Sequence, residues 1–294
     1  EGTQSQKELE RNFLASLAQV YRIMDKPVPE SLLQGDAQAA AQTQALKTPE
    51  TTFEKAADEL RWSDAAKDDR GPGDYFYPTG NEYFPGSWDL QLFDVRWTEA
   101  DAVFTFQMAT LPNFWNAPYG FSYPLVDVYI DINHLPGAGS EILLPGRPGL
   151  VEGTNAWEFA LSVDGWGARL YRYGYGLPPK LLARLPVKVP SVKPAFEVTV
   201  PRRFLRGDPA AWGYGVAVMG CDRPKTKGEN AECRPMEVKA EADPSHFGSA
   251  DLKGKTVKAP PFIDILVPKG VTQNSVLDVY RQGRDVVLPF IRGE

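Results

Sequence analysis

Residues 68–79 read Asp68-Asp-Arg-Gly-Pro-Gly-Asp-Tyr-Phe-Tyr-Pro-Thr79, so that two acids lead into a Gly-Pro-Gly turn. Gly71 and Gly73 are free to adopt positive φ, and Pro72 fixes its own φ, so the pattern predicts a sharp bend. A bend of this kind brings carboxylates and backbone carbonyls together, and calcium prefers such an oxygen-rich arrangement. The alternative is a solvated acidic turn, because the spacing is not that of an EF-hand.

The composition of the 294-residue chain favours a large β domain with many turns. Apolar residues make up 43% and aromatic residues 12%, which is enough for a sizeable core. Glycine and proline contribute 26 residues each, which favours short strands joined by many turns. The net charge of −6 argues against nucleic-acid binding, which leaves a basic footprint. We expect no transmembrane segment, because no apolar run approaches the ~20 residues that span a bilayer.

From Phe84 onward, apolar and polar residues alternate in short runs that are bounded by glycine, proline or asparagine. The clearest run, 125–132, places Val126 and Val128 on one face and Asp127 and Asp131 on the other. Further strands are expected at 157–163, 168–175, 196–200, 212–219 and 262–267, and a short helix at 275–285. Many short strands without intervening helices predict a mainly β fold, an antiparallel β-sandwich.

The first 57 residues read differently, as a helical arm and linker ahead of a β domain at 58–294. Residues 6–24 carry apolar side chains at spacings of three and four, which predicts an amphipathic helix. Residues 36–47 are rich in alanine and glutamine and suit a helix or a tether. A capping-box pattern predicts one more short helix from Thr51 to Leu60. A lone helix with an apolar stripe is marginal in water, so we expect residues 6–24 to dock on the β domain or, preferably, on a partner.

Two cysteines, Cys221 and Cys233, flank a polar segment that contains Pro224 and Gly228. Two cysteines do not make a tetrahedral zinc site without further ligands, and the nearest histidine in the sequence is His246. A disulfide that closes a surface loop is therefore favoured, and it implies an oxidising compartment. The alternative is a pair of free thiols in a cytosolic protein.

Tyr171, Tyr173 and Tyr175 alternate along a predicted strand and therefore share one face. An exposed row of tyrosines suits stacking on the C–H faces of sugar rings, so these residues and Tyr119 are candidate carbohydrate-binding residues. The alternative is that the same rings pack within the sandwich.

Acidic residues outside the bend supply further candidates. Asp131, on the non-core face of the 125–132 strand, is a candidate to join Asp68 and Asp69 in a calcium site, and otherwise it faces solvent. Two carboxylates at a suitable separation would also serve a glycosidase, but the sequence does not supply that separation. A haem held by His134 and a methionine is a weak alternative, because the chain has two histidines and four methionines in all.

Several short motifs follow one another along the chain in a specific order. They are the acidic bend, Phe84-Pro-Gly86 with Asp89-Leu90, Asn116–Ser122, Val128–Asp131, Leu144-Pro-Gly146, Gly165-Trp166 and Phe262–Leu266. Together they resemble the glucodextranase C-terminal domain family, which is DOMON-like and related to modules of bacterial pullulanases and S-layer-associated proteins. The resemblance extends from about Leu60 to Pro289. The chain departs from it at Tyr123-Pro124, in the cysteine loop and in the N-terminal extension.

The resemblance implies a jelly-roll or DOMON-like sandwich that works as an accessory module and not as an enzyme. It implies binding of a glycan or of a component of the bacterial cell envelope, outside the cytoplasm, and it supports calcium as a bound ion. A second hypothesis is a structural subunit of an S-layer or envelope complex that docks through its N-terminal arm.

Overall fold

The computed structural model describes residues 51–226, 228, 231–249, 252–253 and 258–293. Within these residues the chain is mainly β, and its two large sheets are antiparallel, which confirms the predicted class. The helices expected at 6–24 and 36–47 lie outside the described residues. None of the described helices has the length and apolarity needed to cross a membrane.

The first sheet has six strands, in the order β1-β2-β3-β4-β11-β10. Their bounds are β1 Thr52–Ala56, β2 Glu59–Ser63, β3 Leu90–Trp97, β4 Asp101–Met108, β10 Val187–Lys188 and β11 Ala195–Pro201. β4 shows the rule that builds the sheet, because Phe104, Phe106 and Met108 are buried and the residues between them are only half-buried. One face of this sheet therefore points to the core.

The β1–β2 hairpin replaces the helix that the capping-box pattern predicted from Thr51 to Leu60, so that prediction is wrong. Leu60 and Trp62 alternate into the core, and the Phe53 ring lies 5.3 Å from the Trp62 ring. This packing outweighs a local capping preference, which is worth only about 1 kcal/mol. The hairpin also places strand β1 within the residues that the sequence assigned to the linker.

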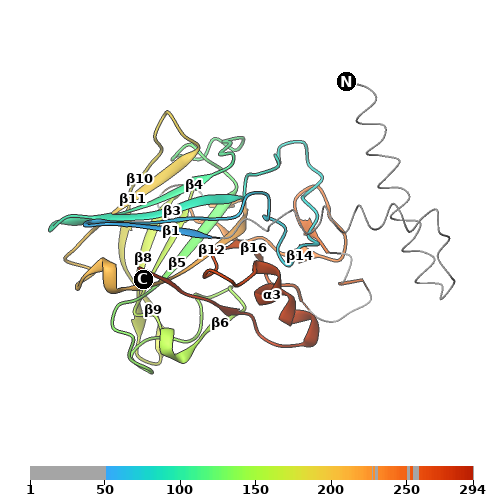
Figure 1. The fold of residues 1–294 in the computed structure, drawn as a ribbon. Helices are drawn as coiled ribbons and strands as arrows, with labels where there is room; N and C mark the ends of the chain where they lie inside the picture. The colour runs from blue at the N-terminus through green and yellow to red at the C-terminus, as the bar shows by residue number, and fades with distance from the viewer. Residues whose placement is uncertain (1–50, 227, 229–230, 250–251, 254–257, 294) are drawn as a thin grey trace, which may run out of the picture. The chain divides into compact units, whose positions relative to one another are not determined.

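The second sheet has the order β13-β12-β5-β7-β8-β9, and β16 and β18 also pair with β12 (Figure 1). The bounds are β5 Pro124–Asp131, β7 Phe159–Asp164, β8 Gly167–Gly174, β9 Leu177–Leu185, β12 Gly213–Asp222, β13 Arg234–Pro235, β16 Phe262–Ile265 and β18 Ile291–Arg292. The strands expected near 125, 157, 168, 212 and 262 are all present, with ends that shift by a few residues.

Aromatic rings join the two sheets across one hydrophobic core. The Tyr214 ring of β12 lies 5.5 Å from the Trp62 ring and 5.8 Å from the Phe93 ring, both of the six-stranded sheet. Phe121 and Phe196 stack at 4.6 Å. The inner faces of the two sheets therefore meet, as in the sandwich that the sequence predicts.

The outer face of the eight-stranded sheet is buried as well, at β5 and β12. Asp127 and Asp131 are 0% exposed, so neither faces solvent, contrary to one sequence-based alternative. The segment between β5 and β7 covers them, and the Leu144 amide in that segment donates to the Tyr129 hydroxyl. Phe290 covers β12 so closely that a Cβ on Gly215 would lie 2.6 Å from its ring.

Short elements complete the described chain. They are β6 Leu150–Val151 paired in parallel with β17 Val287–Leu288, β14 Val238–Lys239 paired in parallel with β15 Phe247–Gly248, the 3₁₀ turns η1 Gly153–Asn155 and η2 Pro209–Ala211, and the C-terminal helices α3 Gln273–Leu277 and η5 Asp278–Gln282. The last two correspond to the short helix expected at 275–285.

Cys221 at the end of β12 forms a disulfide with Cys233, as the sequence favoured. The Cys233 amide donates to Asp164 of the neighbouring β7–β8 region, and the Ala231 carbonyl accepts from Arg169. The disulfide therefore holds a polar loop against the outer face of the eight-stranded sheet.

Removing this disulfide with the double change Cys221→Ala and Cys233→Ala is expected to cost about 3 kcal/mol, because it closes a short loop. The corresponding loss is roughly 6–12 °C in Tm for a domain of this size. Thermal unfolding of both proteins, followed by circular dichroism, measures the difference. Dithiothreitol should lower the Tm of the wild type by the same amount and leave the variant unchanged, and equal Tm values for all samples would contradict the expectation.

Candidate functional site

The bend at residues 68–79 has the backbone conformation that its glycines predict. Gly71 and Gly73 adopt φ values of +57° and +101°. A Cβ on Gly71 would lie 2.4 Å from the ring of Tyr75, so only glycine fits beneath this buried tyrosine. The Tyr75 hydroxyl donates to the Pro260 carbonyl at 2.9 Å, and the Gly71 amide donates to the Ile263 carbonyl at 2.8 Å. The bend is thereby fastened to strand β16.

This attachment brings Asp68 together with two other acids, Asp89 and Asp264, and one carboxylate oxygen from each lies within 4.8 Å of those from the other two. Asp89 immediately precedes β3 of the six-stranded sheet, whereas Asp264 lies within β16. The Leu90 amide donates to Asp264 Oδ2 at 2.8 Å, so the two sheets meet at this point. Asp64, which follows β2, is close enough for its charge to act on Asp68 and Asp264. We call these four residues the aspartate cluster.

Within the residues that the structure describes, each carboxylate of the aspartate cluster has one oxygen without a partner. One oxygen of each is buried and accepts no hydrogen bond: Asp64 Oδ2, Asp68 Oδ1, Asp89 Oδ1 and Asp264 Oδ1. Burial and then the charge of Asp89 raise the pKa of Asp68 to about 7, and burial raises the pKa of Asp89 to about 6. Burial and the charge of Asp64 also raise the pKa of Asp264. Such groups are stable when a cation neutralises them.

The geometry of the aspartate cluster allows several carboxylates to share one ion. One oxygen from each of Asp68, Asp89 and Asp264 lies within 4.8 Å of the other two, which is close enough for all three to reach a single hard cation.

Two acids that the sequence offered for this site are not among the three grouped carboxylates, although the charge of Asp69 acts on Asp68 and Asp89. Asp69 accepts a hydrogen bond from the Tyr77 hydroxyl, and burial raises its pKa. Asp131 accepts from the His134 ring at 2.8 Å on the outer face of its sheet, whereas the aspartate cluster lies on the inner face. In their place the structure supplies Asp89 and Asp264. Asp264 carries a sequence signal that was missed, since it is a charge inside the apolar run 262–266.

Tyr171 and Tyr173 lie on the outer face at one end of β8, and Tyr175 follows in the turn to β9 with a φ of +50°. The register places Tyr171 opposite Ala160 of β7 and Leu181 of β9. The rings of Tyr173 and Tyr175 lie 5.1 Å apart, and Tyr175 is 76% exposed. We call Tyr171, Tyr173 and Tyr175 the tyrosine face. Tyr119 does not join it, because its ring contacts the position of Gly167 at the opposite end of β8.

Charged side chains border the tyrosine face at Tyr171. Arg147, from the segment between β5 and β7, binds Asp127 at 2.8 Å, and its other amino group lies 3.3 Å from the Ser162 hydroxyl. Arg169 binds Asp164 at 2.9 Å and Glu232 at 3.0 Å. Sequence periodicity did not identify Arg147, because it lies in an irregular segment. These groups supply hydrogen-bonding capacity beside the exposed rings.

A family model described as the C-terminal, SLH-like binding module of glucodextranase matches residues 60–289. The matched range contains the aspartate cluster, the tyrosine face and the disulfide. No curated protein matches the chain.

The Arg147–Asp127 pair gives a stability prediction that does not depend on any ligand. Although burial alone would lower it, the Asp127 carboxylate raises the pKa of Arg147. Arg147→Met should cost about 3–5 kcal/mol in urea unfolding, because it leaves the fully buried Asp127 without its cation.

The double change Asp127→Asn and Arg147→Met is the control, because it removes the charge of both partners. It should be more stable than the single variant by at least 1 kcal/mol, since no uncompensated carboxylate remains. A double variant as unstable as the single one would show that Arg147 acts through packing alone.

Proposed function

Because the chain belongs to the family of C-terminal, SLH-like binding modules of glucodextranase, we propose that it is a non-catalytic module that binds carbohydrate through its tyrosine face. The observation that carries this proposal is the exposed ring of Tyr175, which lies 5.1 Å from the half-buried ring of Tyr173 and at the same end of β8 as the half-buried ring of Tyr171. Tyr171 and Tyr173 lie on one side of β8, where residues repeat at about 6.6–6.8 Å, and Tyr175 extends this group of rings into the turn that follows.

The chemistry of the tyrosine face suits a sugar chain. The C–H face of a pyranose ring packs on an aromatic ring, whereas its hydroxyls need hydrogen-bond partners nearby. Tyr171 lies within electrostatic range of Glu232, Arg169 and Arg147, so rings and charged groups are adjacent. The exposed Leu181 on β9 widens the apolar strip.

We further propose that this binding takes place outside the cytoplasm, on the bacterial cell envelope or on secreted polysaccharide. The disulfide supports this location, since such bonds persist in oxidising compartments. The second hypothesis is a structural role in an S-layer or envelope complex, in which residues 6–24 dock on a partner. It predicts binding to isolated cell envelopes that is insensitive to changes in the tyrosine face.

Affinity electrophoresis through gels that contain dextran, pullulan or purified cell-wall polysaccharide tests the tyrosine face. Tyr173→Ala and Tyr175→Ala should each weaken the retardation constant about fivefold, which corresponds to about 1 kcal/mol per stacked ring. Phe114→Ala is the matched control, because Phe114 is also an exposed aromatic residue but lies outside β8 and β9. If all three variants are retarded as strongly as the wild type, the proposal is overturned.

Calcium is the ion that we propose for the aspartate cluster. Asp68, Asp89 and Asp264 would supply at least three ligand oxygens, and Asp64 is the fourth candidate. The ion would neutralise buried carboxylates and tie the bend to both sheets, which is a structural role and not a catalytic one. Its effect on the tyrosine face would be indirect, through the stability of the domain.

Chelation tests this assignment. Excess EDTA should lower the Tm of the wild type, and calcium at a thousandfold above its Kd should restore about 4 kcal/mol of stability. Asp264→Asn should abolish the response to calcium, because it removes a charged ligand. Asp131→Asn should keep the response, since Asp131 lies on the other face of the sheet. A wild-type Tm that ignores both EDTA and calcium would rule out the ion.

A further inference from the structure

A separate pocket opens at the edge of the eight-stranded sheet, away from the tyrosine face. Its volume is about 360 Å³, which lies within the usual range for small-molecule sites. It has an apolar lining formed by Ile132, Phe159, Leu182 and Phe204. Phe159 belongs to the inner face of β7, and Phe204 follows β11. The pocket therefore lies on the inner side of β8, and the tyrosine face on the outer side.

Three arginines complete this pocket: Arg172, Arg203 and Arg206. The register pairs Arg172 of β8 with Phe159 on one side and with Lys180 of β9 on the other, so Lys180 adds a fourth cation next to the pocket. Arg203 lies over the Phe204 ring at 4.9 Å. We call this site the arginine pocket.

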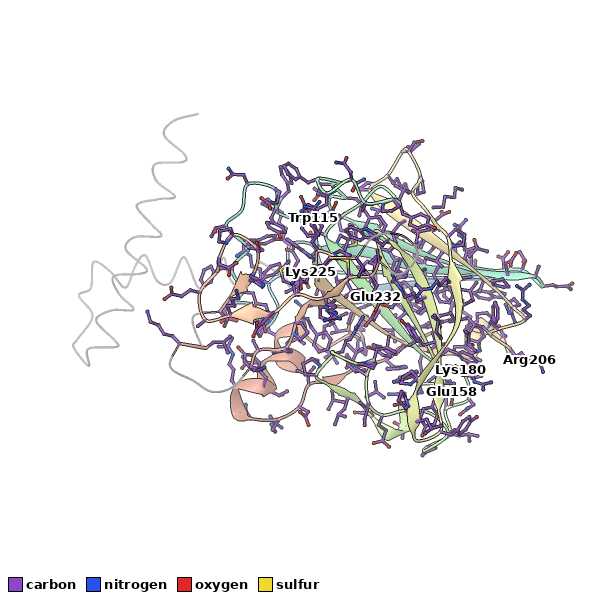
Figure 2. All side chains as sticks on the ribbon, turned by 180° about the vertical axis from the view of Figure 1, so that it is seen from behind. Trp115, Glu158, Lys180, Arg206, Lys225 and Glu232 are labelled. Carbon is purple, nitrogen blue, oxygen red and sulfur yellow. A yellow bond between two sulfur atoms is a disulfide. The ribbon has the colours of Figure 1, made fainter. Side chains whose placement is uncertain are left out.

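The arginines of the arginine pocket differ in their ion pairing from Arg147 and Arg169. Within the part of the chain that the structure describes, no carboxylate forms an ion pair with Arg172, Arg203 or Arg206, whereas Arg147 and Arg169 are paired with buried aspartates. In Figure 2, Glu158 lies at the same end of the domain as Lys180 and Arg206. Its carboxylate accepts from the Ile132 amide at 2.9 Å and the Asn133 amide group at 2.7 Å.

We propose that the arginine pocket binds an acidic sugar, a residue of a glycan that carries a carboxylate, sulfate or phosphate group. Guanidinium groups bind such oxyanions with two parallel hydrogen bonds, and that geometry is specific to arginine. The apolar lining faces the same space, so the C–H surface of the sugar ring packs against Phe204 and Leu182 while its acidic group meets the arginines.

The positive charge of the arginine pocket stands out in a chain with a net charge of −6, and this contrast bears on the kind of ligand. The overall charge repels anionic polymers, so an acidic glycan gains affinity only where cations are clustered. This inference rests on the proposed function, because both take the ligand to be a saccharide. It differs from the tyrosine face in the residues that bind and in the class of sugar that is bound.

Dextran, carboxymethyl-dextran and dextran sulfate share one sugar backbone and differ in charge. Comparing their binding therefore distinguishes recognition of the charged group from recognition of the sugar. Isothermal titration of the full chain at 150 mM salt should show at least tenfold tighter binding of one charged polymer than of dextran. Arg172→Gln and Arg206→Gln should each weaken that binding about tenfold, the effect of one charge-assisted hydrogen bond. Neither change should alter the binding of neutral dextran.

Lys193→Gln and Lys225→Gln are the matched controls, because each removes one positive charge from an exposed lysine outside the pocket. They should change affinity less than twofold. If they weaken binding as much as the arginine changes do, or if charged and neutral dextrans bind the wild type equally, the arginine pocket is not an acidic-sugar site. The side chains of Arg172, Arg206, Lys193 and Lys225 are all exposed, so the Tm of each variant should match that of the wild type.

Further variants identify the acidic group and keep the two proposals distinct. Arg172→Lys retains the positive charge but loses the two parallel hydrogen bonds of the guanidinium group. If the ligand carries a carboxylate, this change should weaken the binding of carboxymethyl-dextran more than that of dextran sulfate. If the ligand carries a sulfate, it should weaken the binding of dextran sulfate more. Tyr175→Ala should affect neutral dextran only. Loss of charged-polymer binding in Tyr175→Ala with no loss in Arg172→Gln would overturn the arginine pocket and leave the tyrosine face standing.

Discussion

A carboxylate that leaves water needs a positive charge, several hydrogen-bond donors or a proton. On the outer face of the eight-stranded sheet that need is met by arginine, since Asp127 binds Arg147 and Asp164 binds Arg169. Between the two sheets it is not met by any side chain described here, because one oxygen of each acid in the aspartate cluster has no partner. The same physical requirement is therefore met by ion pairs on one side of the sheet, and on the other side it leaves the carboxylates for which we propose calcium.

This difference in neutralisation organises the rest of the domain. The Arg147–Asp127 pair allows the segment between β5 and β7 to cover a polar face, and it brings the charge of Arg147 within electrostatic range of Tyr171. The aspartate cluster joins the bend after β2 to β16, and Gln273 of α3 donates to the Asp68 carbonyl at 2.6 Å. Elements that are about 200 residues apart in the sequence are thereby held at one point.

The two proposed ligand sites use opposite sides of strand β8. Tyr171 and Tyr173 point outward and form an aromatic strip, whereas Arg172 between them points inward to the arginine pocket. A neutral stretch of glycan suits the first site and an acidic residue suits the second, because stacking tolerates any sugar face and arginine selects an oxyanion. A single strand thus presents two kinds of chemistry, owing to the alternation of its side chains.

The sequence by itself determined the features that depend on near neighbours. These are the alternation of the strands, the shared face of Tyr171 and Tyr173 on β8, the bend at Gly71 and Gly73, and the short loop that the disulfide closes. Only the tertiary structure decided that Asp68 meets Asp89 and Asp264, and that Thr52–Ser63 forms a hairpin and not a helix. Periodicity tells which face of a strand carries a residue, but not which other segment covers that face. That covering segment determines whether a carboxylate meets an arginine, another carboxylate or water.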